Sequence, residues 1–388
     1  MNLRRLIPFF DDSVSSWSAE ARLLHWLTFV WLCIGLIVLF SASYAVADDR
    51  QYDGLYYFKR QLLWALVGLV FFQIIVNLPL RKILRLSHWF LFILLGFIFA
   101  TLIPGLGKRS LGASRWIPLG PVPLQPSELI KPFLVLQSAR LFSLWDKLSW
   151  RLIFAWLAIF CLIILGILAQ PNLSTTALCG MTIWFIALAA GLPYKYLGGT
   201  ALGGLLLALL SVSIKEYQRQ RIMSFLNPWA DARRHGYQLV QSLLAVGSGG
   251  HWGAGFGLSQ QKLSYLPIQD TDFIFSVFAE EFGFFGSMVL LFMFACYATL
   301  GLRVALKTTK PAHRLVAIGI TLVLVGQSLI HIAVTTGALP TTGLPLPMFS
   351  YGGNSMISSL ISAALLIRVA RESNEAEVVP LHKDRVEN

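Results

Sequence analysis

The chain has 388 residues, of which 56% are hydrophobic and only 13% charged, and its formal net charge is +12 at pH 7. A soluble domain carries about 25% charged residues, so this composition excludes a water-soluble enzyme and a disordered chain. The Lys and Arg residues lie mostly at the ends of apolar runs, where they orient membrane helices and meet anionic head groups. We therefore expect an all-α integral membrane protein that binds no nucleic acid, because a nucleic-acid reader needs a basic face on a soluble module.

The chain contains ten segments that are candidates for membrane-spanning helices, each of which needs about 20 mostly apolar residues. The first is too long for the apolar region of a signal peptide, which has about 7–15 residues, so we expect it to be retained. The fourth is the weakest because it carries Glu128, Lys131 and Arg140. In chain order the ten expected spans are 23–47, 61–78, 88–103, 127–142, 152–169, 173–191, 197–214, 273–302, 315–336 and 354–370.

The basic residues predict the orientation of these spans. An even number of spans leaves both ends on one side, and most basic residues outside the long loop then fall on the inner segments. We expect cytoplasmic tails at 1–22 and 372–388, and a ten-helix membrane domain at 23–371. One large extracytoplasmic loop, 215–272, belongs to that domain. Loops of this length on a rigid helical scaffold often carry function.

Glu128 and Lys131 are ionisable residues inside an expected span, which makes them candidates for a functional site. They are three residues apart, so they share one face of a helix and can pair. Two interpretations are open: a structural ion pair that fixes helix packing, or a polar patch that lines a cavity near the outer leaflet.

Asp270 and Asp272 stand at the outer mouth of the span that begins at residue 273, and Glu280 and Glu281 follow about two turns later. An acid at a helix N-terminus is often only a cap. These acids, however, follow a basic loop, and a carboxylate that faces fixed cations suits a general base beside an anionic group. The residues thus predict a site for a lipid with an anionic head group, which the protein either moves or reacts with. The basic residues of the loop are Lys215, Arg219, Arg221, Arg233 and Arg234.

Several motifs, in order over nearly the whole chain, resemble those of the SEDS family (shape, elongation, division and sporulation), which includes FtsW and RodA. Two stretches, 236–242 and 261–267, are more similar to the division branch, FtsW, than to the elongation branch, RodA. The motifs lie at 41–43, 112–117, 125–131, 217–221, 227–228, 266–275, 280–281 and 344–353.

The resemblance implies a peptidoglycan glycosyltransferase that polymerises lipid II into β-1,4-linked glycan strands for the septal wall. It implies that Asp272 is the catalytic base and that Glu128 and Lys131 line a membrane-facing cavity. Five further residues match motif positions or flank the aspartate, and we expect them to bind substrate or to support the site. They are Arg115, Trp116, Arg221, Asp270 and Glu281.

The sequence departs from the family at two positions. Asn172 replaces a common Asp, and Asp270 replaces a frequent His. A second carboxylate close to Asp272 would raise the pKa of one of the two acids if both share the site, so either acid could act as the base.

The resemblance also implies partners and a location. These are a class B penicillin-binding protein that acts as transpeptidase, other divisome membrane proteins, and the bacterial cytoplasmic (inner) membrane at the septum. A divalent cation, Mg²⁺ or Mn²⁺, could assist the leaving group, although the sequence shows no metal-ligand cluster. The alternatives are a lipid II flippase, an elongation-type RodA polymerase and a scaffold for division proteins.

Overall fold

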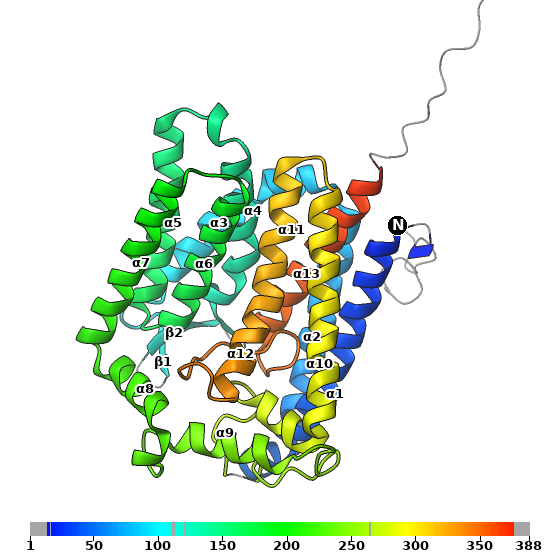
Figure 1. Cartoon of the computed structure of the whole chain (residues 1–388), viewed down its shortest axis with the longest axis vertical. Coiled ribbons are helices and arrows are strands. Elements are labelled where there is room, and N and C mark those ends of the chain that lie inside the picture. Colours follow the sequence, from blue (N-terminus) through cyan, green and yellow to red (C-terminus); the bar gives the residue numbers. More distant parts are fainter. Residues whose placement is uncertain (1–13, 16, 111–112, 120–121, 264, 376–388) are drawn as a thin grey trace, which may run out of the picture.

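The computed structural model describes residues 14–15, 17–110, 113–119, 122–263 and 265–375. Most of the expected tails, 1–22 and 372–388, lies outside these residues. Long helices run side by side through the molecule (Figure 1). The start of the first helix and the end of the last lie at one end of the bundle. This arrangement agrees with two termini on the same side of a membrane.

The described residues form helices at all ten expected positions. Eight spans are long and apolar enough to cross a membrane, which confirms an all-α membrane fold. Of the other two, α6 is short and α4 carries charge, so the count of ten and the orientation stay predictions. The spans are α1 (Ala19–Gln51), α2 (Tyr56–Asn77), α3 (Leu80–Ala100), α4 (Pro126–Ser143), α5 (Trp150–Ala169), α6 (Leu173–Ala189), α7 (Tyr194–Ile214), α10 (Ile274–Lys307), α11 (Pro311–Thr321) with η6 (Leu322–Gly326) and α12 (Gln327–Thr335), and α13 (Gly353–Glu375).

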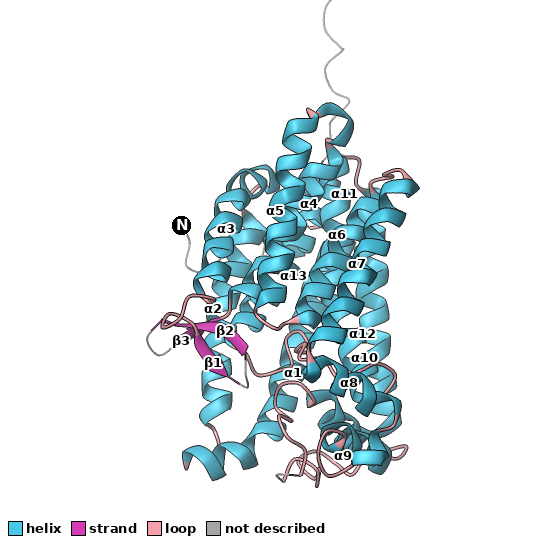
Figure 2. Ribbon diagram, turned by 90° about the vertical axis from the view of Figure 1, so that its left-hand side faces the viewer, coloured by secondary structure: helices cyan, strands magenta, loops and turns pink. Residues whose placement is uncertain are grey.

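Two segments that we expected to be outer loops contain regular structure. The first forms a three-stranded antiparallel sheet in the order β1 (Lys108–Ser110), β2 (Ala113–Leu119), β3 (Val122–Leu124). Figure 2 shows these strands together at one side of the helical bundle. The long loop holds two helices, α8 (Glu216–Leu226) and α9 (Tyr237–Ser248). The segment 215–272 thus contains regular structure, and its place outside the membrane stays a prediction.

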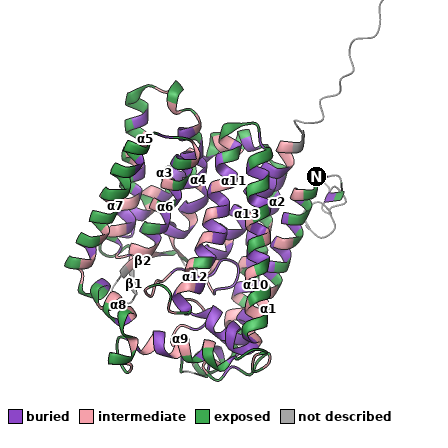
Figure 3. Cartoon of the chain, viewed as in Figure 1, coloured by how far each residue is buried: buried purple, intermediate pink, exposed green. Residues whose placement is uncertain are grey.

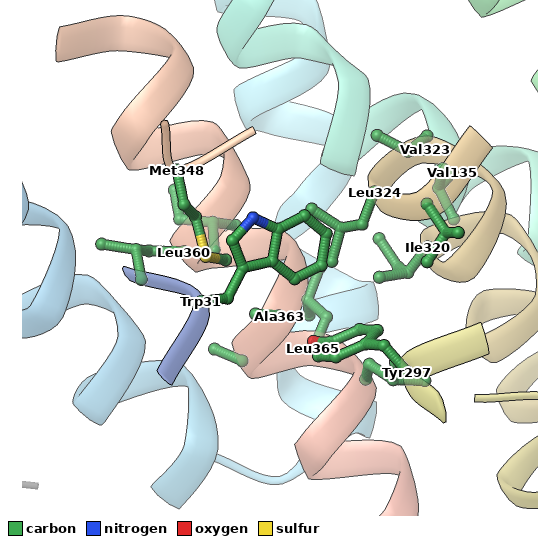
Figure 4. Packing of buried hydrophobic residues seen from close by; sticks show 14 of the residues in the cluster. Trp31, Val135, Tyr297, Ile320, Val323, Leu324, Met348, Leu360, Ala363 and Leu365 are labelled. Atoms are coloured by element: carbon green, nitrogen blue, oxygen red, sulfur yellow. The ribbon is translucent and has the colours of Figure 1, made fainter. Parts of the chain in front are cut away.

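The core is a continuous apolar cluster inside the bundle. Trp31 of α1 is fully buried and contacts Tyr297 of α10 edge-on, with ring centroids 5.3 Å apart. Figure 4 shows this ring among Leu324, Leu360 and other apolar side chains. The outward faces are also apolar: only 11% of the most apolar stretch of α7 is buried, against 89% for α13 (Figure 3). Such exposed apolar faces suit helices whose solvent is lipid.

Helix α10 is broken at Gly283, where φ is +67° and ψ is −163°. The preceding loop fills the break: the Ala254 amide donates to the Glu280 carbonyl and the Phe284 amide donates to the Gly250 carbonyl, each at 2.9 Å. Glycine is needed here because a Cβ at Gly283 would lie 2.3 Å from a backbone nitrogen. These bonds satisfy the backbone groups that the broken helix leaves, as required near a membrane. The break separates the short first part of α10, beside Asp272, from the long spanning part.

Candidate active site

A cavity of about 930 Å³ lies where the sheet, α2, α8 and the loops before α10 and α13 meet. Among the described residues that line it, Asp272 provides the one carboxylate. The same lining contains four guanidinium groups. Lipid-linked diphosphates carry negative charge that such groups can bind. The arginines are Arg60, Arg115, Arg221 and Arg234.

Asp272 is the last residue but one before α10, and the loop that leads into α13 holds its backbone. Ser350 Oγ donates to the Thr271 carbonyl at 2.6 Å, and the Tyr351 amide donates to the Asp270 carbonyl at 2.8 Å. A Cβ placed on Gly343 would lie 3.7 Å from Asp272 Oδ2. The carboxylate thus lies close to the backbone of this loop.

The two arginines whose charges act on Asp272 are held by backbone carbonyls. Arg115 of β2 donates to Gln170 O at 3.3 Å and to Pro171 O at 2.5 Å, just before α6. Arg221 of α8 donates to Thr341 O at 3.1 Å, and its guanidinium lies 4.5 Å from the ring centroid of Tyr217. These contacts orient both guanidinium groups before any substrate binds, as electrostatic catalysis requires.

Burial raises the pKa of Asp272 to about 6, while Arg221 and Arg115 act in the opposite direction and Asp270 raises the pKa further. Burial also lowers the pKa of Arg115. A carboxylate with a pKa of about 6 is ionised for the most part at pH 7 and yet binds a proton readily. This is the property expected of a general base.

The structure brings together four of the residues selected from the sequence: Arg115, Trp116, Arg221 and Asp272 all line the cavity. Asp270 is not among the lining residues, although its charge acts on Asp272. The position of Asp272 therefore favours it over its neighbour as the base. The remaining candidates, Glu128, Lys131 and Glu281, lie elsewhere and their roles stay predictions.

Glu128 and Lys131 form a buried ion pair within the bundle. The Lys131 ammonium lies 2.8 Å from Glu128 Oε2, and the two side chains are only 4% and 2% exposed. Lys131 also donates to Gln327 Oε1 of α12 at 2.8 Å. Neither charged residue lines the 930 Å³ cavity. The burial of both side chains and their position outside the cavity favour a structural ion pair over a polar lining of this cavity.

Glu281 belongs to a second buried cluster, which joins α1, the loop before α10 and α10 itself. Its Oε1 accepts hydrogen bonds from Lys262 Nζ at 2.7 Å and from Ser41 Oγ at 2.6 Å. Lys262 Nζ also donates to Ser41 Oγ at 2.8 Å. The neighbouring Glu280 accepts hydrogen bonds from the backbone amide of Gln260 and the hydroxyl of Ser259. These contacts fasten the loop to the first part of α10.

Replacing Lys262 by Met is expected to lower the free energy of unfolding by about 3–5 kcal/mol, because the Glu281 side chain is fully buried and would lose its cation. Chemical unfolding in detergent micelles measures this loss. The double variant Lys262→Met/Glu281→Leu should recover most of the stability, since both charges are then gone. Lys307→Met, which breaks an exposed pair between the end of α10 and Glu20 of α1, should cost at most about 1 kcal/mol. Equal losses in the single and double Lys262 variants would contradict the assignment.

Sequence reasoning missed several cavity residues. Arg60 comes from the start of α2, far from the motifs. Tyr351 belongs to the motif at 344–353 but was not selected as a site residue. Arg234, which the sequence shows only as one of several basic residues of a loop, and its neighbour His235 also line the cavity. A cation at the head of an otherwise apolar span is the signal that could have selected Arg60.

No group of three or more His, Cys, Asp or Glu side chains that could hold a metal ion occurs in the described part of the chain. The cavity offers a metal the single carboxylate of Asp272 among the residues described there. These residues do not form a protein cage for a cation, and the arginines supply the positive charge of the site.

The fold and the cavity define a multi-pass membrane protein with one acid set among arginines. The family model for FtsW, RodA and SpoVE, described as "Cell cycle protein", matches residues 21–375. The chain belongs to this family, in its FtsW branch.

Similar proteins support both the family and the branch. A Synechocystis protein named "Probable peptidoglycan glycosyltransferase FtsW" is 56% identical over 379 residues, which cover 98% of this chain and 96% of that protein. Stage V sporulation protein E of Bacillus subtilis is 38% identical, over 89% of this chain and 96% of its own length.

Two solved structures share the fold. One, described as "Structural coordination of polymerization and crosslinking by a peptidoglycan synthase complex", matches with a TM-score of 0.73 and 27% identity, over 90% of this chain and 97% of that chain. The rod shape determining protein RodA of Thermus thermophilus matches with a TM-score of 0.65 and 26% identity, over 90% and 96%. These similarities extend over almost the whole bundle.

Proposed function

We propose that the chain is a peptidoglycan glycosyltransferase that polymerises lipid II, with Asp272 as the general base. The observation that carries the proposal is that, among the residues the structure describes, one carboxylate lines the cavity together with four arginines. Relatives that are named peptidoglycan glycosyltransferase FtsW, one of them 56% identical, support the same activity.

In the proposed reaction, Asp272 takes the proton from the 4-hydroxyl of the acceptor N-acetylglucosamine. The freed oxygen attacks the anomeric carbon of the donor N-acetylmuramic acid, and the bond to the undecaprenyl diphosphate breaks with inversion to give the β-1,4 link. Negative charge develops on the departing diphosphate, where Arg221 and Arg115 can stabilise it. The pKa of about 6 allows Asp272 to accept the proton near neutral pH.

In this proposal a divalent cation would bind together with the diphosphate of the substrate and not in a site formed by the protein alone. Mg²⁺ is commonly held by one or two carboxylates together with substrate phosphates. Since the cavity offers it only Asp272 among the described residues, we assign no step to the ion. Polymerisation in excess EDTA tests whether it is needed.

We also propose a class B penicillin-binding protein as the partner, other divisome membrane proteins as neighbours, and the septum of the bacterial inner membrane as the location. The structural match to a chain of a peptidoglycan synthase complex supports a transpeptidase partner.

The alternative function is a lipid II flippase. A transporter needs a site near the middle of the membrane with access from both sides, whereas Asp272 precedes a spanning helix. The test uses the purified chain with its cognate transpeptidase, reconstituted in vesicles with lipid II. Glycan strands are the expected product. Transbilayer movement of lipid II without glycan strands would overturn the proposal in favour of transport.

The polymerisation rate is expected to fall as the pH decreases through about 6, because protonation removes the base. Replacing Asp270 by Asn removes a negative charge that raises the pKa of Asp272, so the midpoint should move to lower pH. Initial rates measured between pH 4.5 and 8 provide the check. Asp146→Asn, at an exposed acid outside the cavity lining, should leave the midpoint unchanged. A midpoint that moves to higher pH in Asp270→Asn would contradict the assignment.

A further inference from the structure

The buried ion pair of α4 is connected to the active-site loop, although it does not line the cavity. Lys131 Nζ donates to Gln327 Oε1 at 2.8 Å, and Gln327 Nε2 donates to the Pro345 carbonyl at 2.6 Å. The amide side chain of Gln327 therefore bridges a buried cation and a residue of the cavity wall.

The connection continues through the loop. The Pro345 carbonyl and the Leu346 amide belong to the same peptide unit, and this amide donates to Ser350 Oγ at 2.8 Å. Ser350 Oγ in turn donates to the Thr271 carbonyl at 2.6 Å, and the peptide unit of that carbonyl includes the amide of Asp272. All four donors point the same way along this path, from the cation toward the acid. Hydrogen bonds aligned in this way polarise one another and stiffen the chain of groups.

The helix that carries Gln327 has an unusual local geometry. Residues Leu322–Gly326 form a π turn between α11 and α12, directly before Gln327. A π turn adds a residue to one turn and so changes the direction of the side chains that follow it; such turns are frequent at functional sites. Gln327 is 1% exposed, and both ends of its amide are bonded.

We propose that Gln327 and Ser350 are positioning residues, which connect the buried Lys131 ammonium to the active-site loop. The path fixes the backbone that precedes the base, so that its carboxylate meets the acceptor hydroxyl in the reactive geometry. It gives the α4 ion pair a role in catalysis without contact to substrate. The inference rests on the proposed function for its kinetic test, but not for its structural test.

The kinetic test compares Gln327→Met, Gln327→Glu and Ser350→Ala in the lipid II polymerisation assay. Met removes both bonds, whereas Glu keeps an acceptor for Lys131 and, when ionised, cannot donate to Pro345. Each variant should lower kcat on the order of 10²-fold, as small misplacements of a catalytic group do, with KM changed less than about threefold. The matched control is Gln137→Met, a buried glutamine of α4 that bonds Ser87, and it should keep the wild-type kcat.

A double-variant cycle examines whether the two residues act on one path. Gln327→Met/Ser350→Ala should lower kcat no further than the more severe single variant, since either change breaks the same connection. Multiplied losses in the double variant would overturn the proposal. So would wild-type kcat in Gln327→Glu, which would leave acceptance of the Lys131 hydrogen bond as the only role of Gln327. A loss in Gln137→Met equal to that in Gln327→Met would also overturn it.

Hydrogen–deuterium exchange of the substrate-free protein provides the structural test. Amides at 268–273 should exchange faster in Gln327→Met and in Ser350→Ala than in wild type. In Gln137→Met their exchange rates should equal those of wild type. Exchange that is unchanged in all variants would overturn the connection. This measurement separates the two proposals, because the exchange result stands even if the wild-type chain forms no glycan strands.

Discussion

Asp272→Asn is expected to lower the rate of lipid II polymerisation by about 10²–10⁴-fold, the range that general base catalysis contributes. Asn has nearly the same shape as Asp, so the cavity should keep its volume and its arginines. The amide cannot accept the proton of the acceptor hydroxyl. Single-turnover polymerisation with the cognate transpeptidase present measures the loss without interference from product release.

The same substitution should not lower the free energy of unfolding, because the pKa of Asp272 is higher in the folded state than in the unfolded state. The folded pKa of Asp272 is about 6, above its ordinary value of 3.8, so the folded state binds the proton more tightly than the unfolded state. The protonated carboxyl group of Asp272 therefore contributes to the stability of the wild-type protein at low pH, and this contribution is lost as the pH rises from about 4 to 6. Asn lacks this titration, so the variant should unfold at the wild-type temperature or above it at pH 7. Retained polymerisation by Asp272→Asn would contradict the assignment of Asp272 as the general base. Loss of activity through unfolding of the variant would also remove the support for that assignment.

The spans were predictable because lipid imposes one simple requirement, an apolar helix of sufficient length. The strands β1 to β3 were not, since they are three to seven residues long and interrupted by Gly and Pro. The helix α8 was hidden for a related reason: it is short and polar, with three charged residues, and its place depends on contacts with residues such as Thr341. Short elements of this kind are determined by tertiary contacts rather than by hydropathy.

The candidate site was predictable in part. Asp272 stands out in the sequence as an acid at the head of a span and Arg221 as one cation of a basic loop, whereas Arg115 was selected by its family motif; the cavity gathers all three. What the sequence could not give was the path between distant residues. Glu128 and Lys131 are visible as charges in a span, but their link to the loop depends on Gln327, a neutral residue 196 positions from Lys131. A neutral polar side chain of this kind cannot be recognised in the sequence as part of such a path, because its hydrogen-bond partners are known only from the packing of the helices.

Arg221→Met is expected to lower kcat by about 10²–10³-fold, because one preorganised donor to a developing negative charge contributes about this much. Arg221 is the stronger candidate of the two arginines that act on Asp272, since its charge has the larger effect on the acid and its guanidinium also stacks on Tyr217. The substitution removes a charge that lowers the pKa of Asp272. The acid limb of the pH profile should therefore move to higher pH, opposite to the shift expected for Asp270→Asn.

Two further variants separate charge, geometry and general electrostatics at this position. Arg221→Lys keeps the charge but loses the planar fork that binds diphosphate oxygens, so it should restore the pH midpoint and only part of kcat. Arg219→Met removes an exposed cation two residues away on the same helix, outside the cavity lining, and should leave both quantities near wild type. Equal losses in Arg219→Met and Arg221→Met would indicate that the loop attracts anionic lipid through its overall charge. A loss confined to Arg221 places the stabilising charge at the departing diphosphate, because long-range attraction does not distinguish residues this close together.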